Sequence, residues 1–436
     1  MDEPSQQLVE FVVSARAVLI DPWELVGDGA VAIGGGRILH LGRRRAVLRR
    51  FSGVKEFSFQ SHLLLPGLVN AHTHLELSFL AGKIPPPAHF TDWVLALMAA
   101  YPHAAGARKI IAAAAHTGAH QSMKSGVTTV GDISRYAAIS RAALRRGPLR
   151  VVSFGEITAL GRSRRRLAGR LRRAAAATLQ SDWVTIGLSP HAPYSVEGPA
   201  LKKIVEVAER RRLPLAMHLA ELSEEREFLA SLGGPLGCRW EFMRKMNLLD
   251  ERIPLFAGGP LAWAGHYGLL NASVPLLLAH VNYVDQADLE LLARSRATVA
   301  LCPRTRHYFG HESRAPHRWR DMLARGINVC LATDSLASNP DLCVLREAQF
   351  VRQREPDADV QELFAMLTTR PARALGLENA IGRLAPGFRA DMLAVEIPAK
   401  EPLSIRSALE RIIRAAPLPA AVWINGRAIF DRAGER

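Results

Sequence analysis

Apolar runs typical of buried strands recur eight times along the middle of this 436-residue sequence, and helical patterns separate them. The first run starts at Leu63, and the others cover residues 128–131, 151–157, 184–188, 214–217, 274–279, 297–301 and 328–332. Helical periodicity lies between the runs, for example over residues 201–212 and 287–295. Eight strands that alternate with helices over about 300 residues predict an α/β fold, a (β/α)8 TIM barrel with its active site at the carboxyl ends of the strands.

The two ends of the sequence have a different pattern. Short strands are indicated at residues 11–20, 29–33, 37–41, 390–395 and 421–430. We therefore expect one small β-sandwich domain built from residues 1–62 and 380–436, and a barrel domain over residues 63–379. A doubly wound open sheet is the alternative for the middle, but no glycine-rich phosphate loop follows any of its strands.

The formal net charge of +15 raises the question of an anionic partner such as nucleic acid. Arginine dominates the basic residues, since only eight of the 56 are lysines. The densest arginine runs, at residues 43–50 and 162–173, lack interleaved aromatic side chains. We interpret them as solvated surfaces and expect no nucleic acid partner. A real anion-binding patch is the alternative, and its binding would depend on salt.

No apolar run approaches the roughly 20 residues that span a bilayer, and the first residues lack the features of a signal peptide. We therefore expect a cytoplasmic protein without membrane contact. Free thiols are expected at Cys238, Cys302, Cys330 and Cys343, which show no paired metal-binding spacing. The expected partner is a small-molecule substrate, and a homodimer is left open.

Two histidines close the first apolar run. Side chains alternate along a strand, so His72 and His74 project to the same face while Thr73 turns away. Later runs end in His218, His280 and Asp334, and a barrel brings its strand ends together. Three imidazoles and a carboxylate predict one divalent metal ion, zinc, with iron as the alternative. The expected ligands are His72, His74, His218 and Asp334. Taken singly, each has an ordinary explanation, as a histidine bonded to backbone or an aspartate that caps a helix.

Such a metal would lower the pKa of its bound water from about 15.7 toward 7, and we expect the resulting hydroxide to be the nucleophile. Asp334 is expected to accept the proton of this water, and His280 to hydrogen-bond the water or the oxyanion. Glu221 is expected to protonate a ring nitrogen of the substrate and to assist the leaving amine, with a salt bridge at the rim as the alternative. No lysine ends the third or fourth strand, so a carbamylated lysine between two metals has no candidate.

Further motifs accompany these residues. They are Pro-Gly-Leu-Val-Asn-Ala-His-Thr-His at 66–74, Ser-Gly-Val-Thr-Thr-Val-Gly-Asp at 125–132, Pro-His-Ala-Pro-Tyr-Ser at 190–195, His-x-x-Glu at 218–221, Thr-Asp-Ser-x-x-Ser-Asn at 333–339 and Gly-Arg-Leu-Ala-Pro-Gly-Phe-Arg-Ala-Asp at 382–391. Together they resemble the amidohydrolase superfamily, in the branch of S-adenosylhomocysteine, aminofutalosine, cytosine and guanine deaminases and triazine chlorohydrolases. The resemblance implies the same four metal ligands, a proton-handling pair of Glu221 and His280, and a substrate contact at His191.

One segment departs from this pattern. After the seventh strand many relatives have an Asn-Pro-x-Ser-Asn loop, whereas residues 302–311 are Cys-Pro-Arg-Thr-Arg-His-Tyr-Phe-Gly-His, similar to the aminofutalosine deaminase-like group. Arg304, Arg306 and His307 would lie near the pocket mouth, where guanidinium groups could bind a carboxylate or phosphate. We hypothesise that they bind an anionic group of the substrate distal to the reacting carbon, and pairing with loop carboxylates is the alternative. The other expected substrate contacts are Glu76, His191 and Ser338.

The sequence thus predicts a metal-dependent hydrolase of carbon–nitrogen bonds other than peptide bonds. A deaminase of an aminopurine-like, aminofutalosine-like heterocycle is the first interpretation, because His218 and Glu221 are paired as in deaminases of aromatic amino-heterocycles. Hydrolysis of a C–Cl or cyclic amide bond on the same metal site is the second. A metal-free binding or scaffold relative is the third.

Overall fold

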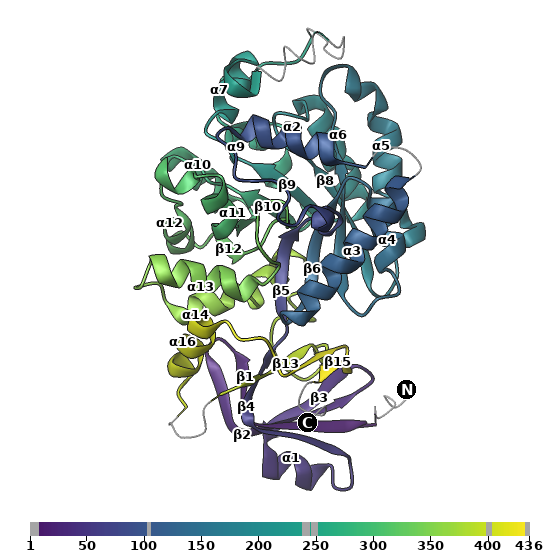
Figure 1. Ribbon diagram of the computed structural model, residues 1–436, viewed down its shortest axis with the longest axis vertical. Coiled ribbons are helices and arrows are strands. Elements are labelled where there is room, and N and C mark those ends of the chain that lie inside the picture. Colours follow the sequence, from purple (N-terminus) through teal and green to yellow (C-terminus); the bar gives the residue numbers. More distant parts are fainter. Residues whose placement is uncertain (1–7, 103–105, 238–244, 246–251, 398–402, 432–436) are drawn as a thin grey trace.

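The computed structural model describes residues 8–102, 106–237, 245, 252–397 and 403–431. It has two parts, a barrel surrounded by helices and a β domain that lies below the barrel in Figure 1. Strands from both ends of the chain form the β domain, and the middle of the chain forms the barrel. The fold class expected from the sequence is therefore confirmed.

Eight parallel strands form the barrel and follow one another in chain order around it. They are β5 (Leu68–Thr73), β6 (Val127–Ser134), β7 (Arg150–Ile157), β8 (Val184–Pro190), β9 (Leu215–Leu219), β10 (Leu276–His280), β11 (Thr298–Leu301) and β12 (Asn328–Leu331). A parallel bridge between Thr73 and Asp334 joins the first strand to the segment after the last. This contact brings the two edges of the sheet together.

Helices follow the strands and surround the barrel (Figure 1). They are α2 (Phe90–Ala100), α3 (Ala107–Lys124), α4 (Ala137–Leu144), α5 (Leu167–Ala174), α6 (Gly198–Arg211), α7 (Glu225–Ser231), α9 (Pro260–His266), α10 (Gln286–Arg294), α11 (Pro303–Tyr308), α12 (Trp319–Ala324), α13 (Val344–Arg354), α14 (Val360–Ala365), α15 (Thr369–Ala374) and α16 (Ile405–Ala415). Short 3-10 helices are η1 (Leu75–Leu80), η3 (Gly161–Arg166), η4 (Ala177–Leu179), η5 (Leu269–Asn271) and η6 (His311–Ser313). The two helices expected over residues 201–212 and 287–295 are α6 and α10. Helix α6 buries Leu201, Ile204 and Val205, a helical spacing that turns one face to the strands.

The β domain is one continuous seven-stranded sheet in the order β15-β14-β13-β4-β1-β2-β3. Its strands are β1 (Phe11–Asp21), β2 (Glu24–Gly34), β3 (Arg37–Arg43), β4 (Glu56–Pro66), β13 (Met392–Glu396), β14 (Ala421–Ile424) and β15 (Arg427–Asp431), and α1 (Arg44–Arg50) follows β3. Strands β1 and β4 are parallel, and the other neighbours are antiparallel. A β domain built from both chain ends was expected, and its strands lie in a single mixed sheet.

The apolar run that starts at Leu63 is shared between the two parts. Strand β4 ends at Pro66 in the β domain, and β5 begins at Leu68 in the barrel. Gly67 lies between them, where a Cβ atom would come within 2.3 Å of the Thr128 hydroxyl oxygen. Only glycine fits so close to β6 without displacing it. Because both strands are buried, the sequence shows no polar residue at this junction and the run looks like one strand.

Arg150 connects the barrel to the β domain. It begins β7, and its guanidinium forms a buried ion pair with Asp391 and donates a hydrogen bond to Asn425 Oδ1 at 2.5 Å. The amide of Gly67 donates to the Asp391 carbonyl at 2.9 Å. These contacts lie at the amino ends of the barrel strands, so the β domain leaves their carboxyl ends open for a site.

Within the described residues, no helix combines the length and hydropathy needed to cross a membrane. Cys302, Cys330 and Cys343 are buried free thiols, as expected. Cys238 lies outside the described residues.

We expect Gly67→Ala to lower the free energy of unfolding by about 1–3 kcal/mol, because the added methyl group would overlap Thr128. Gly27→Ala is the matched control, since a Cβ atom at Gly27 meets no atom within 4 Å. Chemical denaturation followed by circular dichroism compares the two variants. Equal unfolding free energies for both would contradict the close approach at Gly67.

Candidate metal centre

The carboxyl ends of four barrel strands bring together the ionisable side chains that the sequence singled out. His72 lies in β5 and His74 directly follows it, His218 lies in β9, His280 ends β10, and Asp334 follows β12. Parallel pairing places His218 opposite Ala279, one residue before His280. These residues therefore meet at one rim although they are far apart in the sequence.

The nitrogen and oxygen atoms of these side chains converge. His74 Nε2 lies 3.2 Å from His218 Nε2 and 3.5 Å from Asp334 Oδ1. His72 Nε2 lies 3.7 Å from the same carboxylate oxygen. Ligand atoms that each bond a tetrahedral zinc ion at about 2.0–2.1 Å stand at comparable separations. Three of the four expected ligands, His72, His74 and Asp334, have ligand atoms within 4.8 Å of one another, and His218 lies beside His74.

Neighbouring groups orient two of the four. His218 Nδ1 lies 3.0 Å from the His191 carbonyl, which can only accept, so Nδ1 carries the hydrogen and Nε2 keeps a lone pair for a metal. The Ser338 hydroxyl donates to Asp334 Oδ2 at 3.0 Å, which leaves Oδ1 facing the histidines. Both contacts hold a potential ligand atom toward the cluster.

His72 supplies the test of whether a metal fits. Its side chain is fully buried, and neither ring nitrogen has a hydrogen-bond partner among the described residues. Burial, and then the charge of His218, lowers the pKa of His72 well below its usual range. Burial also lowers the pKa of His218 to about 4. Neutral buried imidazoles without partners are costly by themselves, whereas a divalent cation would satisfy them. The donor set therefore fits a metal such as zinc.

Four residues at this rim have positive φ angles without being glycine. They are Ala220 (49°), His280 (72°), Val281 (51°) and Asp334 (57°). Each stands at or just after the end of a barrel strand. Such conformations cost free energy and are found where the surrounding structure holds a functional group in place.

Glu221 and His280, which the sequence predicts as a proton-handling pair, lie next to each other. Glu221 Oε1 lies 3.5 Å from His280 Nε2, and its Oε2 accepts a hydrogen bond from the Tyr194 hydroxyl at 3.1 Å. Burial, with the charges of Asp334 and Glu225, raises the pKa of Glu221 well above its usual value. Burial lowers the pKa of His280 well below its usual value. These two shifts favour the uncharged form of both the carboxyl and the imidazole. His280 also lies within reach of the metal ligands, since it groups with His72 and His218.

His191 lies beside this cluster and is the most open of its histidines. Its ring centre is 5.1 Å from that of His218, and its side chain is 25% exposed. Nδ1 is 2.6 Å from the Ser195 hydroxyl, and Nε2 is 3.8 Å from Glu156 Oε1. This position is compatible with the substrate contact expected from the sequence.

Glu76 is engaged within the protein. It is buried, and its carboxylate accepts hydrogen bonds from Tyr101, Ser134 and the amides of Arg135 and Tyr136. Four donors occupy the acceptor sites of a carboxylate. Ser338 is likewise buried and bonded to Asp334 and Thr305. The expectation that Glu76 and Ser338 contact substrate is corrected: Glu76 holds the end of β6, and Ser338 positions Asp334.

Arg304 also has a structural role, so the expectation that it binds an anionic substrate group is corrected. Its guanidinium pairs with Asp341 at 2.9 Å and with Glu347 at 2.7 Å. Both carboxylates lie more than 30 residues later in the chain, in the segment after β12 and in α13. Pairing with carboxylates of the protein was the alternative interpretation of the sequence.

Among the described residues, no contact joins Arg306 or His307 to a metal ligand. His307 is 57% exposed and pairs with Glu312 at 2.9 Å, so its expected substrate contact is not supported. Arg306 is buried and lines a separate cavity that does not contain the metal ligands. His311, from the same loop, lines a small pocket at the barrel mouth.

Aromatic side chains next to the metal centre were missed by the sequence analysis. The ring of Phe90 lies 5.3 Å from that of Phe309 and 6.3 Å from that of Tyr194, between ring centres. Phe90 and Phe309 line the small mouth pocket with His311. These rings come from three separate segments, so no local pattern marks them. The one available signal was that Tyr194 follows the Pro-His-Ala-Pro motif at residues 190–193. Flat apolar faces of this kind suit a heteroaromatic ring.

Comparison with known proteins matches residues 63–429 to the model of the Amidohydrolase family. Among curated relatives, a 5-methylthioadenosine/S-adenosylhomocysteine deaminase of Pyrococcus furiosus is 27% identical over 82% of this chain and 80% of its own length. An aminodeoxyfutalosine deaminase of Deinococcus radiodurans is 29% identical over 80% of this chain and 81% of its own length.

Solved structures share the fold. Helicobacter pylori aminofutalosine deaminase has a TM-score of 0.82 at 20% identity, covering 96% of this chain and all of the other. A zinc-bound adenosine deaminase from Xanthomonas campestris has a TM-score of 0.80 at 21% identity, covering 97% and 93%. Atrazine chlorohydrolase from Arthrobacter aurescens, complexed with zinc, has a TM-score of 0.78 at 17% identity, covering 97% and 95%.

We expect His72→Ala to lose bound metal, because His72 stands at the centre of the ligand cluster and has no other partner. Metal per chain, measured by inductively coupled plasma mass spectrometry, reports the loss. His116→Ala, at an exposed position of α3, is the control and should keep its metal. A folded His72→Ala protein with wild-type metal content would contradict the assignment.

Proposed function

Because the chain belongs to the amidohydrolase family, we propose that it is a metal-dependent deaminase of an adenine-like heterocycle. The observation that carries this proposal is the position of Glu221, a buried carboxyl 3.5 Å from His280 and beside the ligand cluster. Deamination needs an acid at this place, since the ring must be protonated while water attacks the carbon that bears the amino group. The deaminase names of the relatives support the same reaction.

His72, His74, His218 and Asp334 would hold one divalent ion, for which we propose zinc, with iron as the alternative. When bound, the ion supplies Lewis acidity that lowers the pKa of a water molecule from 15.7 to about 7. The buried, neutral imidazoles suit this task because they keep their lone pairs free at neutral pH.

Glu221 would move the proton in the reaction. Since burial raises its pKa, the protonated form of the carboxyl is favoured, and this form can donate to a ring nitrogen of the substrate. Water then adds its oxygen to the amino-bearing carbon and gives a proton to Asp334, which passes it to the amino group. The carbon–nitrogen bond breaks, ammonia leaves, and the proton of the new hydroxyl returns to Glu221 as the ring carbonyl forms. Tyr194 fixes Oε2 of the same carboxyl, so that Oε1 faces His280.

His280 would orient the attacking water or the developing oxyanion. Its low pKa keeps the imidazole neutral, so it can donate one hydrogen bond without carrying charge. His191 is proposed to contact the substrate ring, next to the aromatic side chains of Phe90 and Phe309. The cytoplasmic location and the homodimer expected from the sequence stay predictions.

Zinc-loaded protein should release ammonia from an adenine-containing nucleoside panel of adenosine, 5-methylthioadenosine and S-adenosylhomocysteine. Glu221→Gln should keep its metal but lower turnover by about two to four orders of magnitude, since it cannot give up a proton. Glu290→Gln, at an exposed position of α10, is the matched control and should retain turnover. A coupled assay for ammonia measures all three proteins.

Two results would contradict this function. The first is no ammonia from any member of the panel, together with chloride release from a chlorotriazine. That result would favour the alternative reaction on the same metal site. The second is wild-type turnover by Glu221→Gln.

Tyr194→Phe should shift the pH profile of turnover. The Tyr194 hydroxyl donates to Glu221 and so lowers the pKa of that carboxyl, although burial and nearby charges outweigh it. Removing the donor favours the protonated acid. The alkaline limb of the profile should therefore move to higher pH, by up to about one unit. A shift to lower pH, or none, would contradict the role of Glu221 as the acid.

A further inference from the structure

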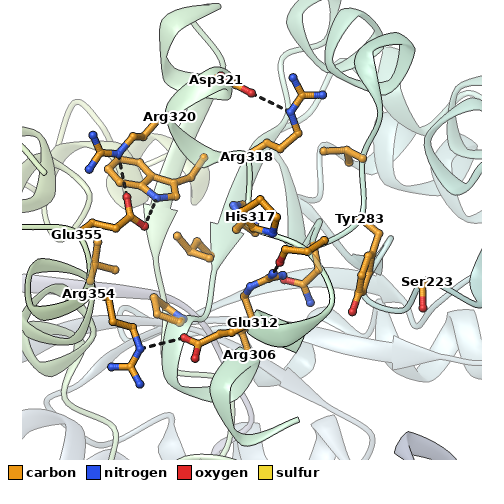
Figure 2. A pocket seen from close by; sticks show the side chains of 18 of the residues that line it. Ser223, Tyr283, Arg306, Glu312, His317, Arg318, Arg320, Asp321, Arg354 and Glu355 are labelled. Carbon is orange, nitrogen blue, oxygen red and sulfur yellow. Dashed lines mark hydrogen bonds and ion pairs between the residues drawn. The ribbon is translucent and has the colours of Figure 1, made fainter. Parts of the chain in front are cut away.

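A cavity of about 1220 Å³ lies next to the metal centre but does not include it. It is bounded by the loop after β10, by residues 303–321 after β11, and by α12 and α13. Figure 2 shows Arg306 and His317 next to each other on one wall, with Tyr283 nearby. The volume lies above the roughly 300–1,000 Å³ of most small-molecule sites in proteins, so it has room for a ligand and water.

The strand layer of the barrel separates this cavity from the metal centre. Leu301, Trp319 and Val351 line the cavity and pack with the strands and the outer helices. Ala300 and Cys302, on either side of Leu301, belong instead to the cluster inside the barrel. The cavity therefore lies outside the strands, whereas the metal ligands face inward.

A polar contact also separates the cavity from the pocket at the barrel mouth. The Tyr283 hydroxyl lies 2.9 Å from His311 Nδ1. Tyr283 lines the large cavity, and His311 lines the mouth pocket. A ligand in the cavity would consequently occupy a site of its own.

Arg306 differs from the other arginines of the cavity. The others each pair with a carboxylate, as Arg226–Asp285, Arg318–Asp321, Arg320–Glu355 and Arg354–Glu312, the last three drawn as dashed lines in Figure 2. Among the described residues, Arg306 has no carboxylate within ion-pair distance. Burial lowers the pKa of Arg306, and the charge of Glu312 opposes this shift without an ion pair between them. The Glu312 carboxylate pairs instead with His307 and Arg354.

The guanidinium of Arg306 is fixed but incompletely bonded. Its Nη2 donates to the carbonyls of His311, at 3.2 Å, and Ala315. Its Nη1 is buried without a partner, and the residue is only 5% exposed. A buried cation without a counter-charge is unfavourable, so this position suits an anion that accepts from Nη1.

His317 adds a second unpartnered atom. Its Nε2 donates to the His280 carbonyl at 3.0 Å, which leaves Nδ1 as an acceptor, and that atom is buried without a partner. A ligand with a donor near its anionic group would satisfy both Arg306 and His317. Such a ligand would stand one side chain away from His280.

Apolar side chains form one part of the remaining lining, which also carries the paired arginines and carboxylates. The apolar ones include Leu301, Trp319, Phe350 and Val351. The indole nitrogen of Trp319 is already bonded to Glu355, so its ring offers only apolar surface. These walls favour an apolar ring over a small hydrated ion.

We propose that this cavity is a second ligand-binding site, for an aromatic carboxylic acid whose carboxylate pairs with Arg306 and whose ring lies against the apolar wall. The unpaired and incompletely bonded guanidinium of Arg306 and the apolar part of the lining point to this class of ligand. The site is independent of the deaminase reaction, since the metal ligands are not part of it.

Benzoate and its neutral isostere benzamide test the site by isothermal titration calorimetry on zinc-loaded protein, with inorganic phosphate as a third probe. Benzoate should bind saturably with a Kd of about 1 mM or lower. Benzamide and phosphate should bind at least about 10-fold more weakly. Arg306→Gln should weaken benzoate binding by about 10-fold or more. Arg318→Gln, which alters a paired arginine of the same cavity, should leave it within about twofold.

Val284→Trp is a second variant that places a larger side chain in the cavity lining and leaves Arg306 itself unchanged, and it should abolish benzoate binding. This variant keeps the proposal testable if Arg306→Gln does not fold. Benzoate affinity unchanged by Val284→Trp would overturn the proposal, because the acid would then bind elsewhere, such as at the metal. Equal affinities for benzoate and benzamide, or for benzoate and phosphate, would also overturn it.

Discussion

Hydrogen bonds between the first and last barrel strands hold the metal centre together. The Asp334 amide donates to the His72 carbonyl at 3.1 Å, and the Thr73 hydroxyl donates to the Asp334 carbonyl at 2.9 Å. The side chain of Asn70 extends this contact to Thr333. The same contacts therefore close the barrel and hold the Asp334 carboxylate next to the histidines. A change that loosened this closure would separate the ligands even if every ligand residue remained in the chain.

Burial explains both halves of the proposed chemistry. It lowers the pKa of His72 and His280, which favours neutral imidazoles, and it raises the pKa of Glu221, which favours the protonated carboxyl. One low-dielectric environment thus prepares metal ligands and a general acid at the same time. The cost of burying a charge also draws attention to the neighbouring cavity. Arg306 is buried there without a carboxylate partner, whereas the other arginines of the cavity each pair with one.

Much of the fold and the core of the site could be predicted from the sequence, because both depend on local patterns. Apolar runs mark the barrel strands, and a titratable residue directly after such a run must lie at the barrel rim. The break at Gly67 could not be predicted, since it depends on the approach of Thr128 from another strand. Arg304 was misassigned for a similar reason: its partners Asp341 and Glu347 come from later segments, and nothing near Arg304 indicates that its charge is already compensated. Side-chain chemistry shows what a residue can bind, whereas only the tertiary structure shows what it does bind.

The central claim is that side chains from distant strands surround a single cation. Anomalous X-ray scattering from crystals of the metal-loaded protein, collected on both sides of the zinc absorption edge, tests this most directly. The account predicts one strong anomalous peak per chain, within bonding distance of His72 Nε2, His74 Nε2, His218 Nε2 and Asp334 Oδ1. A peak bound by other residues, or imidazoles of His72 and His218 turned away from each other with no peak between them, would contradict it.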